Sequence, residues 1–192
     1  MKKLSVTSKK NGLGNEAVSP VVGVMLMLVV TLIIAAVVSA FAGGLTETTS
    51  KAPQLSLKAT YSQTDGLTIS HQGGDAIGTL DTVIIVRLGS TFGDAGHMAW
   101  TQNATTIVNK RGAAAGGTDA WLREGGYSGV KSFAPGDNAY IEPPYNAKEF
   151  MQPGATATYG FDAPANIGKT FWIELADKSG KTFAKTEVTI AP

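Results

Sequence analysis

The 192-residue sequence predicts an α+β protein, in which one long apolar N-terminal helix precedes an antiparallel β-sandwich head of Ig-like or barrel-like form. Two observations predict this class. Residues 17–46 contain no Asp, Glu, Lys or Arg, so this stretch must leave water. Beyond it, short segments alternate apolar and polar residues between glycine-containing turns, as in sandwiches and barrels. These features divide the chain into a leader at 1–17, an apolar helix at 18–45 and a head at 46–192.

The apolar core of the helix runs from Val21 to Ala42, which is 22 residues. At about 1.5 Å per residue it is roughly 33 Å long, close to the ~30 Å of bilayer hydrocarbon. It has no polar face, which is typical of helices in lipid or packed by neighbours on all sides. Pro20 suits the first turn, and Gly43-Gly44 suits the end. An ordinary cleaved secretory signal stays an alternative, although its apolar core is usually only about 7–15 residues.

Charge is divided unevenly along the chain. Residues 1–17 carry four lysines and one glutamate, a net charge of +3, whereas the remainder carries −2. By the positive-inside rule, the lysines keep the leader in the cytoplasm and place the head outside the cell. The head has no basic patch, so nucleic acid is not an expected partner. The chain has no cysteine, which excludes disulfides and thiolate metal ligands.

Period-two alternation predicts the strands of the head. A turn at Thr64-Asp65-Gly66, with Gly66 in the left-handed conformation, separates the first two strands. A hairpin turn at 177–180 separates the last two. The more continuous apolar run at 82–88 is expected at the centre of the sheet. The expected strands span residues 55–62, 67–71, 82–88, 98–102, 105–109, 139–141, 155–161, 171–175 and 182–190.

A glycine-rich stretch at 111–129 has no regular period and predicts a long exposed loop, with a short helical turn near Trp121. Loops of this length in compact domains are usually functional or disordered. Trp100, Trp121 and Trp172 are all expected in the core or at an interface, and Trp121, which lies in this stretch, is the first candidate among them for a contact residue.

Residues with candidate chemistry are few. His71 and Asp75 form a possible metal pair, but His97 is the only other histidine, so a strand end and turn is the preferred interpretation. No DxDxDG calcium loop and no GxSxG nucleophile elbow occurs. We expect no enzymatic activity, no cofactor and no metal site. Asn103-Ala104-Thr105 is the one N-x-S/T sequon, which makes Asn103 a candidate for N-glycosylation and the chain a candidate glycoprotein.

The residues at the start of the helix carry a family resemblance. Residues 16–26, EAVSPVVGVML, follow a short lysine-bearing leader and open a helix that leads into a β-rich head. This arrangement resembles the N-terminal signature of archaeal type IV pilins. The resemblance is strong over roughly residues 9–45. It is weaker at 69–77, where ISHQGGDAI is similar to head domains of that family.

The resemblance implies a class III signal peptide, which a prepilin peptidase in the membrane cuts on the cytoplasmic side. It places Glu16 two residues before the cut, Ala17 just before it and Val18 at the new N-terminus. Cleavage after Gly14 is the second choice. Bacterial type IV pilins carry a glutamate at the fifth mature position, where this chain has Val22. This chain therefore cannot pair a glutamate at that position with the N-terminus of a neighbouring subunit.

The resemblance also implies a structural role. The subunit would wait in the cell membrane and then polymerise through its helix into an extracellular pilus filament, used for adhesion or cell–cell contact. Its partners would be identical subunits in a homo-polymer, the prepilin peptidase, a pilus assembly ATPase and a membrane platform protein. The alternatives are an archaellin-type filament subunit, a membrane-tethered extracellular binding domain that does not polymerise, and a small secreted enzyme.

Overall fold

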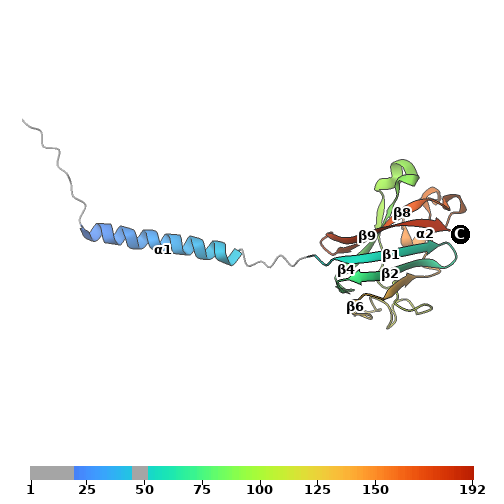
Figure 1. The fold of residues 1–192 in the computed structure, drawn as a ribbon, viewed down its shortest axis with the longest axis horizontal. Helices are drawn as coiled ribbons and strands as arrows, with labels where there is room; N and C mark the ends of the chain where they lie inside the picture. The colour runs from blue at the N-terminus through green and yellow to red at the C-terminus, as the bar shows by residue number, and fades with distance from the viewer. Residues whose placement is uncertain (1–19, 45–51) are drawn as a thin grey trace, which may run out of the picture. The chain divides into compact units, whose positions relative to one another are not determined.

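The computed structural model describes residues 20–44 and 52–192, which belong to two compact units. The first is a single long helix and the second is a mostly antiparallel β domain (Figure 1). The predicted α+β class is therefore confirmed. The expected leader at 1–17 lies outside the described residues.

The apolar stretch forms α1, a helix of 25 residues from Pro20 to Gly44. The helix begins at the proline and ends at the glycine pair, as the sequence predicts. The hydroxyl of Thr31 donates a 2.9 Å hydrogen bond to the carbonyl oxygen of Leu28. A polar side chain in the middle of the helix is thereby satisfied without a partner from outside, which suits an apolar environment.

The head, from residue 52 onward, is built from short strands joined by turns and brief helices. The strands are β1 (Leu55–Ser62), β2 (Gly66–Gly74), β3 (Ile77–Gly78), β4 (Thr82–Leu88), β5 (Ala99–Thr101), β6 (Ser132–Phe133), β7 (Asn138–Ile141), β8 (Thr170–Asp177) and β9 (Thr182–Ala191). The helices are η1 (Ser90–His97), α2 (Lys148–Met151), η2 (Ala157–Tyr159) and η3 (Pro164–Asn166).

Seven strands form one sheet in the order β5-β4-β8-β9-β1-β2-β7, and β3 pairs separately with β6. All neighbours are antiparallel except β1 and β9, which run parallel and pair only at Tyr61↔Ile190 and Ser62↔Ala191. The sheet curls into a half-barrel, so of the two predicted forms the barrel-like one is nearer. Register shifts at Ser56/Leu57 and at Leu175/Ala176 increase the local twist and help the sheet to curl.

The core lies against one face of this sheet and is rich in aromatic rings. Phe161 and Phe171 stack with their centroids 4.3 Å apart, and Tyr61 meets both rings edge-on. The Tyr61 hydroxyl donates a 3.1 Å hydrogen bond to the carbonyl oxygen of Asn146. Burial, with a smaller contribution from the charge of Asp162, raises the pKa of Tyr61 above its ordinary value. Each fully buried side chain of this kind stabilises the fold by about 1.5–3 kcal/mol.

Most strand predictions are confirmed. β1 and β4 have the predicted bounds, and β2, β7, β8 and β9 contain the predicted segments. Gly66 has a φ of +85°, as its turn requires. In the hairpin between β8 and β9, Oδ1 of Asp177 accepts hydrogen bonds from the backbone of Ser179 and of Lys181. The β5 strand is shorter than its prediction.

Two strand predictions are wrong. Residues 105–109 contribute only two isolated bridges, both at Val108. Residues 155–161 form turns and η2, because two buried side-chain amides satisfy their backbone in place of a strand ladder. Nδ2 of Asn166 donates to the carbonyl oxygens of Thr158 and Gly160, and Oε1 of Gln152 accepts from the backbone N–H of Phe161.

Candidate functional site

Helix α1 presents apolar side chains around its whole circumference. The exposed fractions of its large apolar side chains run from 43% at Val30 to 70% at Met27, and residues 24–30 are all exposed. Because seven consecutive residues cover almost two turns, they include every face of the helix. The segment Pro20–Phe41 is long and apolar enough to cross a bilayer. Such a surface is suited to lipid or to other apolar helices, and not to water.

The sequon residue Asn103 lies at an exposed turn that follows β5. Its Oδ1 accepts a 3.0 Å hydrogen bond from the backbone N–H of Thr105, and its carbonyl oxygen accepts one of 2.8 Å from the hydroxyl of Thr106. The side-chain amide is therefore held in one orientation at an accessible surface. This geometry is compatible with modification of Asn103.

His71 and Asp75 lie near each other but do not form a pair of metal ligands. Nε2 of His71 is 3.0 Å from the backbone oxygen of Asp75, while the Asp75 carboxylate accepts the backbone N–H of Gln54 at 2.9 Å. The ring of His71 is buried against Phe133. Within 20–44 and 52–192, no group of three or more His, Asp or Glu residues is placed to hold a metal ion. The preferred interpretation, a strand end and turn, matches this geometry.

Trp121 lies in the core, so the core role predicted for it is confirmed and the contact role is wrong. Its side chain is 1% exposed, its Nε1 donates a 2.7 Å hydrogen bond to Oδ1 of Asn109, and its ring lies against Phe133. The chain around it is irregular, as predicted, but it contains no helix and it is fastened to the domain. Val108 forms isolated bridges to Ala120 and to Tyr140 of β7.

The family comparison concerns the N-terminal region. Residues 16–57 match the family described as "Archaeal Type IV pilin, N-terminal". This range covers all of α1 and reaches into β1. A protein of Archaeoglobus fulgidus, described as uncharacterized, is 33% identical over 103 residues, which cover 48% of this chain and 72% of that protein. The chain belongs to the archaeal type IV pilin family.

Family membership gives α1 a functional meaning. This pilin is a type IV pilin-like filament subunit, and the whole of α1 lies within the matched range. The predicted processing residues Glu16, Ala17 and Val18 lie outside the described residues. The matched range begins at Glu16.

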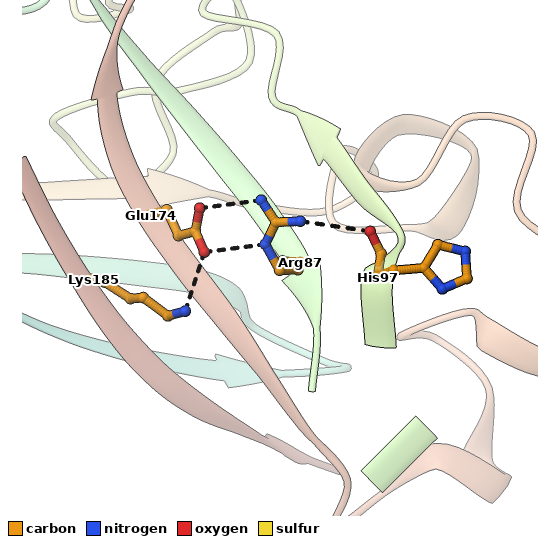
Figure 2. Close-up of polar contacts among 4 residues, drawn as sticks. All are labelled: Arg87, His97, Glu174 and Lys185. Atoms are coloured by element: carbon orange, nitrogen blue, oxygen red, sulfur yellow. Dashed lines mark hydrogen bonds and ion pairs between the residues drawn. The ribbon is translucent and has the colours of Figure 1, made fainter. Parts of the chain in front are cut away.

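The pilin head also contains an ionic cluster that the sequence analysis missed (Figure 2). Glu174 of β8 lies between Arg87 of β4 and Lys185 of β9, with Oε1 3.1 Å from Nε of Arg87 and 3.3 Å from Nζ of Lys185. Nη1 of Arg87 also donates to the carbonyl oxygen of His97 at 3.5 Å. Burial by itself would raise the pKa of Glu174, but the two cations outweigh it and hold that pKa below its ordinary value. Lys185 also lies 4.2 Å above the ring of Trp172.

This cluster is structural in character. It joins three neighbouring strands. In the register, Glu174 of β8 stands opposite Lys185 of β9 on one side and opposite Ile85 of β4, two residues from Arg87, on the other. Its carboxylate is already fully engaged by cations and is nearly covered, so it is not placed to act on a substrate. The missing signal was the pairing of β4 with β8, because Arg87 is 87 residues from Glu174 in the sequence, whereas Lys185 faces Glu174 across the predicted hairpin.

Proposed function

We propose that this pilin is a structural subunit of an extracellular type IV pilus, that it polymerises through α1, and that the filament serves adhesion or cell–cell contact. The observation that carries the proposal is the uniform apolar surface of α1, which is exposed on every side. A membrane anchor for one folded domain needs only length and hydrophobicity. A helix without any polar face is in addition able to exchange lipid for the apolar sides of several neighbouring helices.

Processing is the step that would convert the anchor into a building block. Before cleavage, the four lysines of the leader keep it in the cytoplasm, because moving them across the bilayer is unfavourable. After a prepilin peptidase cuts between Ala17 and Val18, that restraint is gone. A pilus assembly ATPase and a membrane platform protein would then move the helix from the bilayer into the filament. The subunit is thus located first in the cell membrane and then in the extracellular pilus.

The proposal assigns no catalysis, cofactor or metal to the head. The head would form the outer part of the filament, where adhesion takes place, and would carry a glycan on Asn103. A sequon at an exposed turn on the extracellular side supports that modification.

The mature N-terminus tests the function directly. Filaments sheared from cells would be purified, and the N-terminal peptide of the subunit would be identified by mass spectrometry. We expect chains that begin at Val18. Chains that keep Met1 would instead support a tethered binding domain, and a start near Gly43 or Leu45 would support ordinary secretion; either result would overturn the proposal.

A further inference from the structure

We propose that the groove beside Asn103 holds the first sugars of the glycan attached to that residue, so that the glycan is packed against the head rather than free in solvent. The inference rests on the proposed modification of Asn103. It assigns an occupant to a surface groove, and it makes the glycan part of the folded structure of the head.

The groove has a suitable size and starts at the right residue. Its volume is about 190 Å³, and Asn103 is itself part of its wall. That volume corresponds to about six water molecules at ~30 Å³ each, which is comparable with one sugar ring. A second groove of about 170 Å³ shares Thr106, Ala115 and Tyr145 with the first. The two adjoin, which offers a path for a second sugar.

The acceptor amide is held in place at the mouth of this groove. Oδ1 of Asn103 is occupied by the backbone N–H of Thr105 at 3.0 Å. Nδ2, the atom to which a sugar becomes attached, has no hydrogen-bond partner among residues 20–44 and 52–192. The attached sugar therefore starts from a fixed amide plane beside the groove. This reduces the conformational entropy that docking would cost.

The chemistry of the walls matches a carbohydrate. Tyr145 and Phe150 meet edge-to-face with ring centroids 5.1 Å apart, and Phe150 is 47% exposed although it is fully apolar. Sugar rings carry C–H groups on their faces, and these pack against aromatic rings. Glu124 and Thr105 add polar atoms to the same groove, where hydroxyl groups of a sugar would find hydrogen-bond partners. A glycan docked here would cover the exposed part of Phe150.

The chain offers a matched pair of substitutions for the test. Thr105→Ala removes the sequon, whereas Thr105→Ser keeps it, and both preserve the backbone N–H that holds Asn103. Each would be combined with Phe150→Ala in pilin purified from the cells that produce and modify it. Mass spectrometry of the peptide spanning Asn103 reports the glycan, and the melting temperature of the head reports docking. Tyr127→Ala, at an aromatic residue that is 73% exposed and outside both groove walls, is the control.

We expect the Thr105→Ser pilin to carry the glycan and to lose about 2–4 °C of melting temperature when Phe150→Ala is added, because a domain of this size shifts by that amount for one such contact. In the Thr105→Ala background, Phe150→Ala should change the melting temperature by much less. An equal loss in both backgrounds, with glycan present on the Thr105→Ser pilin, would overturn the docking. An unmodified Asn103 would overturn the docking and the modification together. It would leave the filament proposal intact, since that depends on the mature N-terminus.

Discussion

Nε1 of Trp121 donates a 2.7 Å hydrogen bond to Oδ1 of Asn109, across twelve residues of chain that has almost no regular secondary structure. The ring of Trp121 fills the core beside Phe133. One large buried side chain with its polar atom satisfied thus fastens a glycine-rich stretch to the sheet. This relationship explains why the stretch is folded although its sequence has no periodicity.

Replacing Trp121 should therefore destabilise the whole head. We expect Trp121→Ala to lower the free energy of unfolding by about 3–5 kcal/mol, because it leaves a large cavity. Trp121→Phe should cost about 1–3 kcal/mol, since Asn109 loses its donor. Urea denaturation followed by circular dichroism measures both values. Tyr127→Phe is the exposed control and should change stability by less than about 0.5 kcal/mol. A Trp121→Ala head as stable as the control would contradict the role of Trp121.

Glu174 should make the stability of the head depend on pH. Its pKa is lowered in the folded state by Arg87 and Lys185, so its stabilising effect is present above the unfolded pKa, close to 4.5, and is lost as the pH falls through the lower folded pKa. We expect Glu174→Gln to cost about 1–2 kcal/mol at pH 7. The difference from the wild type should shrink below about pH 4.5.

The comparison for that experiment is Glu187→Gln, at an exposed position of β9 opposite Trp172. Thermal unfolding of both variants would be recorded from about pH 3 to about pH 7, because carboxylates titrate within this range. Two results would argue against the ionic cluster. One is a loss of stability in Glu174→Gln that stays constant over the whole pH range, and the other is a loss equal to that of Glu187→Gln.

Gly66 should tolerate no side chain. Its φ is +85°, and a Cβ atom added there would clash with the backbone oxygen of Ile141 in β7. Gly180 has a similar φ of +90° but open space around it. We expect Gly180→Ala to cost about 1–2 kcal/mol for the left-handed backbone alone. Gly66→Ala should cost at least twice as much, because β7 must also move. Equal melting temperatures for the two variants would show that the contact with β7 is not restrictive.

A charge in the middle of α1 should prevent assembly. Val30→Asp introduces an ionised side chain that costs about 2.5–3.5 kcal/mol at the centre of a membrane helix, and it would also lie among apolar neighbours in a filament. We expect cells producing this variant to keep the subunit in the membrane fraction, as shown by immunoblotting, but to form no filaments in electron micrographs. Val30→Leu is the control and should assemble. Normal filaments from Val30→Asp would count against polymerisation through α1.

Much of this molecule follows from local sequence. The bounds of α1 could be predicted because an uncharged apolar run of this length, opened by Pro20 and closed by Gly43-Gly44, has one favourable structure in lipid. Strand β1 was predictable because alternating burial leaves a period of two in the chain, and β4 because it is a short, nearly continuous run of apolar β-branched residues. The turn at Gly66 was predictable because glycine alone enters that conformation without strain. The family resemblance also rests on one continuous segment at the start of α1.

Tertiary structure decided the rest, since contacts between distant residues leave no periodic trace. Residues 155–161 alternate like a strand, but buried amides of Gln152 and Asn166 satisfy their backbone and prevent pairing. The cluster around Glu174 exists only because β4, β8 and β9 become neighbours. Trp121 became a core residue because the glycine-rich stretch folds back onto Val108, which in turn bridges to Tyr140 of β7. The sequence by itself therefore determined the helix and most strands, whereas the curled seven-stranded sheet and the groove at Asn103 depend on non-local pairing.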